Sequence, residues 1–300
     1  MNINEKQNSE RNLKRLAAQR QLYSEAKELM IVQFILSGFF TVVIAIVGNV
    51  IDEKYLAYTV FAAILIAFFD ELLLSKKIDS IKEDAARIQE EFDCDVLRIP
   101  QNKIKIGNIL LTETVQEKSK KYTSKHNDYS ALIDWYPGID EEDNRYYRLI
   151  CQATNCWWNQ NLRKRYSEIL LMLLSCVFAM LLLLAIIRGI TISVFLMTVV
   201  SPILPAFILV YKTVKDNGIA IDNLNHMKGK LYEIISKAEN IEHYSDEHLL
   251  NDSRCLQDMI FDNRASSPLI PDKLYFRQRD SYEQIAYDTN NELIGKIKQL

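Results

Sequence analysis

The sequence predicts an all-α membrane protein whose four transmembrane helices form two hairpins. Long uncharged stretches carry this prediction: residues 29–51, 169–187 and 189–211 contain no Asp, Glu, Lys or Arg. A bilayer core about 30 Å thick needs about 20 helical residues, so each stretch is long enough or nearly so to cross it. Only 8 of the 300 residues are glycine, which fits a mostly helical chain with few tight turns.

The fourth stretch, residues 55–69, is shorter, with 15 residues before Asp70 and Glu71. We interpret it as a span because the turn before it is very short. It reaches spanning length if it continues through residues 72–74, with the two carboxylates at the level of the lipid headgroups. Carboxylates in that position either mark the water boundary or line a cation pathway.

Loop charges predict the orientation, because cytoplasmic loops are enriched in Lys and Arg. Six such residues precede the first span, basic residues flank the middle segment on both sides, and the two short turns carry few. We therefore expect both termini and the middle segment in the cytosol. The expected parts are a cytosolic amphipathic helix (1–29), hairpin 1 (30–75), a cytosolic middle segment (76–166), hairpin 2 (167–212) and a cytosolic helical C-terminal domain (213–300).

The cytosolic parts are predicted to be helical extensions of the spans. Helix 10–29 continues into the first span, and helix 76–93 continues the second. A loop or extended piece at 95–108, a helix at 113–125 and a turn at 134–138 follow, and a helix from about 143 leads into the third span. After the last span we expect helices at 212–241, 246–264 and 282–298. The first of these three carries an apolar seam that is a candidate oligomer contact: Leu224, Met227, Leu231, Ile234, Ala238 and Ile241.

Small and polar residues recur every fourth position along the first span. These residues share one helical stripe, which does not face lipid and therefore either packs against a helix or lines a water path. Packing is the favoured interpretation, also for a similar stripe of Thr59, Ala63 and Ala67 in the second span. The first stripe consists of Gln33, Ser37, Thr41, Ala45 and Asn49. In the last span, Pro202 and Pro205 are expected to kink or break the helix.

No enzyme motif is present: the chain lacks a Gly-rich phosphate loop, an HExxH pair and a Gly-x-Ser-x-Gly elbow. Cys151 and Cys156 have the wrong spacing for half of a zinc site, and no matching pair exists. We expect no enzymatic activity, no catalytic residues, no metal and no cofactor.

Aromatic and arginine residues are concentrated in the predicted cytosolic parts. Aromatic faces stack on bases and guanidinium groups hold phosphates, so this mixture is suited to a nucleotide. Such residues near a membrane also serve as interface anchors or core. The candidate ligand-binding residues are Trp135, Tyr136, Arg148, Trp157, Trp158, Arg163, Tyr275 and Arg277.

Several segments, taken in order, resemble the SMODS-associating four-transmembrane effector family. They are residues 16–27 (LAAQRQLYSEAK), 134–137 (DWYP), 151–159 (CQATNCWWN), 162–166 (LRKRY) and 267–271 (SPLIP). The resemblance covers nearly the whole chain and the same layout of two plus two spans. It implies a role in bacterial anti-phage signalling of the CBASS type, in which a nucleotidyltransferase makes a cyclic oligonucleotide that an effector senses.

The resemblance implies an effector in the bacterial inner membrane that binds a cyclic oligonucleotide in the cytosol and disrupts the membrane, so that the host dies before phage mature. Its expected partners are the nucleotide, the bilayer and further copies of itself, with the cyclic-nucleotide synthase as functional partner. A scaffold that recruits a cytosolic protein is the alternative reading. A small channel or transporter fits less well, because no charge is predicted within the membrane interior.

Overall fold

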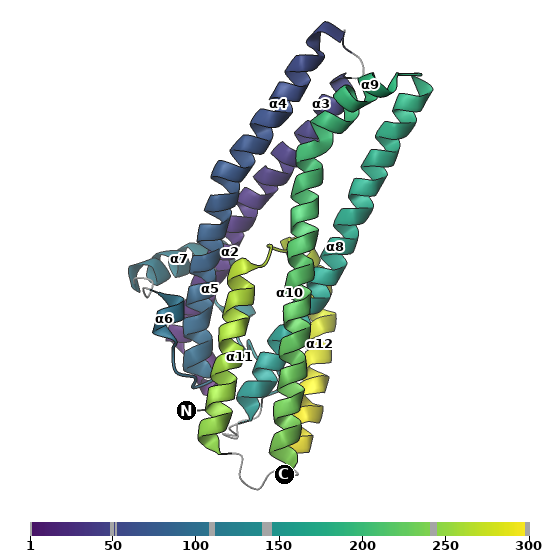
Figure 1. Cartoon of the computed structure of the whole chain (residues 1–300). Coiled ribbons are helices and arrows are strands. Elements are labelled where there is room, and N and C mark those ends of the chain that lie inside the picture. The colour runs from purple at the N-terminus through teal and green to yellow at the C-terminus, as the bar shows by residue number, and fades with distance from the viewer. Residues whose placement is uncertain are drawn as a thin grey trace. The chain divides into compact units, whose positions relative to one another are not determined.

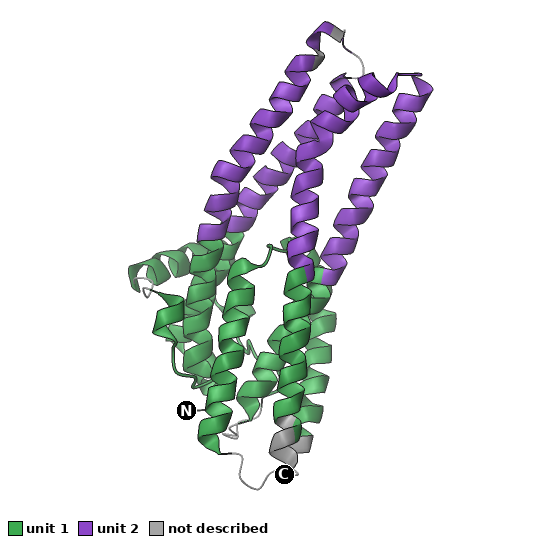
Figure 2. Cartoon of the chain, in the orientation of Figure 1, with its two compact units in different colours: residues 1–25, 81–163, 219–300 green, residues 26–80, 164–218 purple. Residues whose placement is uncertain are grey.

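The computed structural model describes residues 2–48, 51, 53–107, 112–139, 146–240 and 245–297. These residues are largely helical and contain no β-strand (Figure 1), which confirms the predicted all-α class. Packing divides the chain into two units, coloured separately in Figure 2. Unit 1 comprises residues 1–25, 81–163 and 219–300, and unit 2 comprises residues 26–80 and 164–218.

Four helical runs in the described part of the chain are long and apolar enough to cross a membrane: Glu10–Gly48, Ala57–Val96, Tyr147–Ile187 and Ile192–Ile234. They contain the four predicted spans. Each run has 39 to 43 residues, about twice what a bilayer needs, so only part of each would lie in lipid. The predicted hairpins, residues 30–75 and 167–212, fall inside unit 2.

Unit 2 contains three π-helical segments: η1 (Phe34–Phe40), η3 (Asp70–Ser75) and η5 (Leu196–Val200). Such wide turns are rare and often mark functional positions. The other elements that contribute to this unit are α2 (Glu10–Gln33), α3 (Thr41–Gly48), η2 (Glu53–Tyr55), α4 (Leu56–Phe69), α5 (Lys76–Val96), α8 (Tyr147–Ile187), α9 (Ile192–Phe195) and α10 (Ser201–Asn240).

Small and branched apolar side chains together form a core cluster in unit 2. Ala45 of α3 is fully buried and packs with Leu181 of α8 and Val199 of η5. A Cβ atom added at Gly48 would lie 3.6 Å from the Cα atom of Thr198, so α3 and η5 approach closely. The opposite faces of these helices carry large exposed apolar residues, Ile187 among them at 81%. Small residues where two helices approach closely, with large apolar residues on the outer faces, are typical of helices packed in lipid.

The structure buries the polar stripe of the first span. Ser37, Thr41 and Ala45 are 0% exposed and Gln33 is 9% exposed. In the predicted stripe of the second span, Thr59 and Ala63 are also buried, whereas Ala67 is half-buried. This is the packing arrangement that the sequence favoured over a water-lined face. Asn49, the last member of the first stripe, lies outside the described residues.

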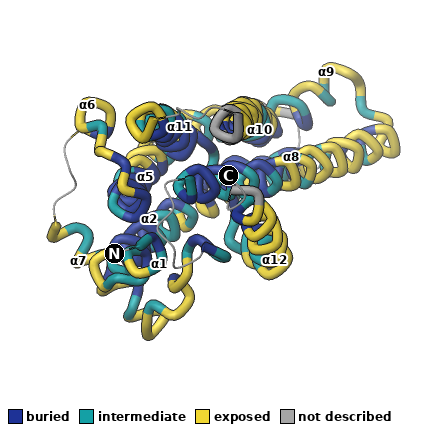
Figure 3. Tube along the Cα trace, turned by 90° about the horizontal axis from the view of Figure 1, so that it is seen from below, coloured by how far each residue is buried: buried dark blue, intermediate teal, exposed yellow. Residues whose placement is uncertain are grey.

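Unit 1 has a core in which α2, α5 and α8 meet, shown in dark blue in Figure 3. Its largest fully buried side chains include Leu16, Phe92 and Tyr147, one from each of these helices. The remaining helices that contribute to unit 1 are α1 (Ile3–Gln7), α6 (Lys103–Ile106), α7 (Thr112–His126), η4 (Ser130–Leu132), α10, α11 (Asp246–Ser266) and α12 (Asp272–Ile297).

The apolar seam of α10 belongs to this interior and corrects one prediction. Met227 and Leu231 are 0% exposed and pack with Leu149 of α8 and Leu256 of α11. The described part of the seam is therefore occupied within the chain and is not a free oligomer contact. A helical seam looks the same in sequence whether its partner is another copy or another helix of the same chain.

Pro205 lies inside α10, so the helix is not broken there, and η5 ends at the residue before α10 begins. Two local expectations differ from the structure. The last helix begins at Asp272, ten residues before the predicted start, with the Asp272 carboxylate in its first turn. Lys103–Ile106 is one helical turn capped by Asn102 and not an extended piece.

Candidate functional site

Four aromatic rings of α8 and α12 form a cluster in unit 1. The Trp158 ring centroid lies 5.9 Å from that of Tyr275 and 5.5 Å from that of Tyr282. The Trp157 centroid lies 5.2 Å from that of Tyr282. Trp157, Trp158 and Tyr275 were predicted as candidate ligand residues, and the structure brings these three together. We call this group, together with Phe276 and Arg20, the aromatic–arginine cluster.

Arg20 of α2 supplies the positive charge of the cluster. Its guanidinium carbon lies 5.1 Å from the Tyr275 centroid and 5.3 Å from the Phe276 centroid. Both distances are within the range in which a cation is attracted to a ring face. Arg20 is half-buried and Phe276 is 50% exposed, so the cluster reaches the surface of the unit.

Helix geometry explains why these rings share a face. Tyr275 and Tyr282 are seven residues apart, which is two helical turns and places both on one side of α12. The early start of α12 is what includes Tyr275 in the helix: the backbone amides of Leu274 and Tyr275 donate to the carbonyl of Pro271. Without this first turn, Tyr275 would lie in the preceding loop.

Two polar groups of α8 lie near the cluster along the same helix. The indole Nε1 of Trp158 is buried and finds no acceptor among the described residues. Arg163 is 6% exposed, and its Nη1 donates to the carbonyl of Pro268 over 2.9 Å. Burial lowers the pKa of the Arg163 guanidinium to about 10.

The other predicted ligand residues lie elsewhere. Tyr136 is 2% exposed, and its hydroxyl donates to Asp93 Oδ1 over 2.6 Å. Trp135 packs edge to face on Phe92. Tyr136 therefore belongs to the core of unit 1, and Trp135 packs against that core. Arg148 is half-buried on α8, and Arg277 is exposed on α12. Tyr136 and Trp135 therefore belong with the core around Phe92 rather than with the aromatic–arginine cluster.

Sequence reasoning missed Arg20 and Tyr282 as cluster members. Arg20 is one of the basic residues of the predicted N-terminal amphipathic helix, and Tyr275 lies 255 positions further along the chain, so no local pattern links them. Tyr282 carries a usable signal, because its seven-residue spacing from Tyr275 places both on one helical face. The spacing is informative only if the last helix is predicted to begin before residue 275, and the sequence analysis predicts a start at residue 282.

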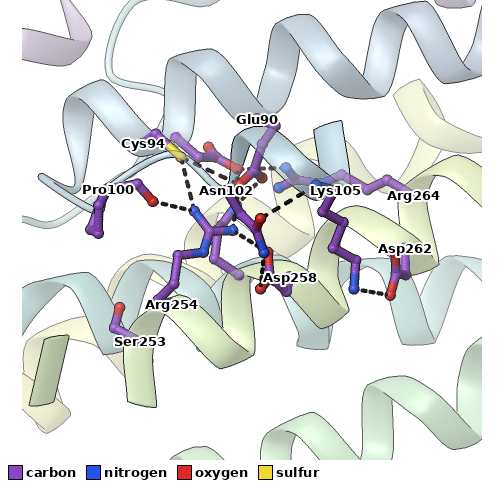
Figure 4. Close-up of polar contacts among 12 residues, drawn as sticks. Glu90, Cys94, Pro100, Asn102, Lys105, Ser253, Arg254, Asp258, Asp262 and Arg264 are labelled. Atoms are coloured by element: carbon purple, nitrogen blue, oxygen red, sulfur yellow. Dashed lines mark hydrogen bonds and ion pairs between the residues drawn. The ribbon is translucent and has the colours of Figure 1, made fainter. Parts of the chain in front are cut away.

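Unit 1 also contains a buried polar network, which connects α11 to α5. Figure 4 shows its Arg254 side, where Nη2 donates to Glu90 Oε1 over 2.7 Å. Arg264 Nη1 lies 2.5 Å from Asp93 Oδ2, and Gln257 Nε2 donates to both carboxylates. Burial raises the pKa of Glu90, and the nearby Asp93 charge adds to this effect. Each acid has an arginine partner, which is the arrangement of a structural network.

In unit 2, Asp70 and Glu71 have different surroundings although they are adjacent. Asp70 accepts hydrogen bonds from Gln33 and Ser37 of the first span. Glu71 forms an ion pair with Lys212 of α10, with 3.2 Å between Nζ and Oε2. Asp70 and Glu71 therefore have separate partners and do not act as a pair. Further along the first span, the Thr41 hydroxyl donates back to the carbonyls of Ser37 and Gly38.

The fold defines a multi-pass helical membrane protein with a second helical unit that carries an aromatic–arginine cluster. The family model of the SMODS-associating 4TM effector domain matches residues 1–293, and the chain belongs to this family. A curated relative, described as a probable CBASS effector molecule of Bacillus cereus (strain VD146), is 26% identical over 302 residues. That alignment covers 97% of this chain and 98% of the relative. No solved structure matches the chain.

The family and the relative thus place this chain among the CBASS effectors of the four-transmembrane type. At that level, the context implies a cyclic oligonucleotide signal and a cyclase as functional partner. The resemblance seen in the sequence is confirmed.

Proposed function

We propose that this protein senses a cyclic oligonucleotide in the cytosol with unit 1 and permeabilises the bacterial inner membrane with unit 2. The cell then dies before phage mature. The observation that carries the proposal is the aromatic–arginine cluster of unit 1. It offers ring faces for bases and a guanidinium for phosphodiester groups within one small surface.

The chemistry of the cluster matches a cyclic oligonucleotide in three respects. Trp158 and Tyr275 present aromatic faces, and base stacking on such faces contributes about 1–3 kcal/mol per base. Arg20 offers a planar fork of donors suited to phosphate oxygens. The buried Nε1 of Trp158 is a further donor, which a base or ribose oxygen reaches once the side chains that cover it move.

The composition of unit 1 supports the proposed orientation. The N-terminal, middle and C-terminal segments pack into one unit, so they must lie on the same side of the membrane. Two predicted spans separate each of these segments from the next, and an even number of spans returns the chain to the side on which it started. The Lys and Arg content of the same segments favours the cytosolic side, which is where a cyclase releases its product.

Permeabilisation requires more than one copy of unit 2. The interior of the unit is filled by side chains such as Ala45, Leu181 and Val199, and a packed helical bundle has no pore. We propose that nucleotide binding drives self-association and that several copies form the path. The partner surface is not the α10 seam, since Met227 and Leu231 are used within the chain.

Binding can be tested with the protein's own tryptophans. The chain has three, and a Trp135→Phe variant leaves only the two of the cluster as fluorophores. We expect a panel of cyclic dinucleotides and cyclic trinucleotides to contain a member that quenches them. Tyr275→Ala in this background should weaken that binding about 5- to 150-fold, the loss of one stacked base. Tyr232→Ala removes an exposed tyrosine of the same unit and should leave binding unchanged.

Permeabilisation can be tested with a potential-sensitive dye in proteoliposomes that hold the full chain. The nucleotide that binds is expected to depolarise them, and Tyr275→Ala is expected to shift the required concentration by the same factor. Binding with an unchanged membrane potential would instead support the scaffold alternative. Equal binding by wild type and the Tyr275→Ala variant would show that the ligand site lies elsewhere.

A further inference from the structure

Asp70 is a carboxylate built into the contact between the first two spans of unit 2. Its Oδ1 accepts a hydrogen bond from Gln33 Nε2 over 2.5 Å, and its Oδ2 accepts one from the Ser37 hydroxyl over 2.8 Å. Gln33 Nε2 also lies 3.1 Å from the Ser75 hydroxyl. Gln33 and Ser37 are buried, so the first span directs its polar stripe at this one carboxylate.

All the partners of Asp70 among the described residues are neutral. Lys212 forms an ion pair with Glu71, the residue next to Asp70 in the sequence. The Lys212 and Glu71 side chains are 51% and 68% exposed. The exposed pair is balanced and solvated. Asp70 has no such balance, and an acid within or near a span whose charge is not neutralised is generally part of an ion or substrate pathway.

Two π-helical segments meet at this contact. Ser37 lies within η1, and Asp70 is the first residue of η3. A π-turn holds about one residue more than an α-turn, so its conversion to α-helix turns the following side chains by about 100° relative to the preceding ones. Either segment can therefore separate Asp70 from Gln33 and Ser37 without unfolding a helix.

We propose that Asp70 is the cation-selecting group of the membrane path. In the resting protein its oxygens are occupied by Gln33 and Ser37. When the two helices shift, the carboxylate is released and faces the path, where it attracts cations and repels anions. The leak is then selective for cations. This inference rests on the proposed permeabilisation and assigns its selectivity to one residue.

The chemical difference between Asp and Asn separates selectivity from packing. An Asp70→Asn variant keeps one side-chain oxygen that accepts from Gln33 or Ser37, replaces the other acceptor by an NH2 donor, and removes the charge at nearly unchanged volume. Asp79→Asn is the matched control, because it makes the same change in net charge at an exposed carboxylate of α5 in the same unit. Circular dichroism and elution volume in detergent confirm that both variants fold.

The test uses phosphatidylcholine vesicles with a tenfold KCl gradient and the same panel of cyclic dinucleotides and trinucleotides. The wild type and Asp79→Asn are expected to hold the membrane near the K⁺ equilibrium potential once activated. Asp70→Asn is expected to leak with a reversal potential near zero. A wild-type leak without cation preference, or an Asp70→Asn leak as selective as the wild type, would overturn the inference but not the proposed function. Absence of a leak with every panel member would overturn both.

Discussion

Removal of the Arg264 charge tests how the buried network holds unit 1 together. Arg264 Nη1 lies 2.5 Å from Asp93 Oδ2, and the two side chains are 7% and 0% exposed. An Arg264→Met change keeps much of the volume and leaves the Asp93 carboxylate buried without its cation. Loss of one partner of a buried pair costs about 3–5 kcal/mol. The Tyr136 and Gln257 donors to Asp93 remain, so we expect the lower limit of about 3 kcal/mol.

The matched control is Arg279→Met in α12. Arg279 pairs with Glu283 one turn away, and the two side chains are 28% and 44% exposed. An exposed pair of this spacing contributes about 0.3–0.5 kcal/mol. The two variants remove the same charge and differ in the burial of the acid left behind.

The measurement is thermal unfolding of the full chain in detergent, followed by hydrogen exchange of α5 and α11. In a unit of this size, 1 kcal/mol corresponds to about 2–4 °C in Tm. Arg264→Met should therefore lower Tm by about 6–12 °C and speed exchange in both helices, whereas Arg279→Met should change Tm by less than about 2 °C. Adding Asp93→Asn to Arg264→Met should recover part of the loss. Equal shifts for the two single variants, or no recovery in the double variant, would refute the reasoning.

Two further predictions concern pH and packing. Burial acts to raise the pKa of Glu25, but hydrogen bonds from Lys118 and Lys121 outweigh it and lower this pKa from 4.5 to about 2. Because the folded-state value is the lower one, the stabilisation is complete above pH 4.5 and is lost as the pH falls toward 2. Tm measured against pH should fall less steeply over this interval for Glu25→Gln, and an equal slope would contradict the assignment. Ala45→Leu should destabilise the protein by about 1–3 kcal/mol through overpacking of a fully buried site, whereas Ile46→Leu, at a residue 39% exposed, should not. Similar melting of both variants would argue against the packing role of the stripe.

Patterns confined to a single helix were readable in the sequence. The uncharged stretches located the spans because spanning length and the absence of charge are local properties. The four-residue recurrence of Gln33, Ser37, Thr41 and Ala45 identified the face that unit 2 buries. The same logic found the α10 seam but not its partner, since Met227 and Leu231 pack with α8 and α11 of their own chain.

Contacts between distant segments explain what sequence reasoning could not reach. Tyr136 and Trp158 look alike as candidate ligand residues, yet a hydrogen bond to Asp93 holds the first in the core while the second joins the ring cluster. Arg20 meets Tyr275 only because α2 and α12 pack together. The Pro271 carbonyl accepts the backbone hydrogen bonds of the first turn of α12, whereas the sequence predicts that this helix starts only at residue 282.

Length, charge and periodicity by themselves determined that this protein is helical and has four candidate spans, because hydrophobicity is a property of each segment alone. The resemblance of several segments, taken in order, indicated the family that the family model confirms. Only the tertiary structure decided which aromatic residues gather around Arg20 and that Asp70, rather than Glu71, lies against the first span. Both depend on which helix faces meet, and that is set by packing between residues far apart in sequence.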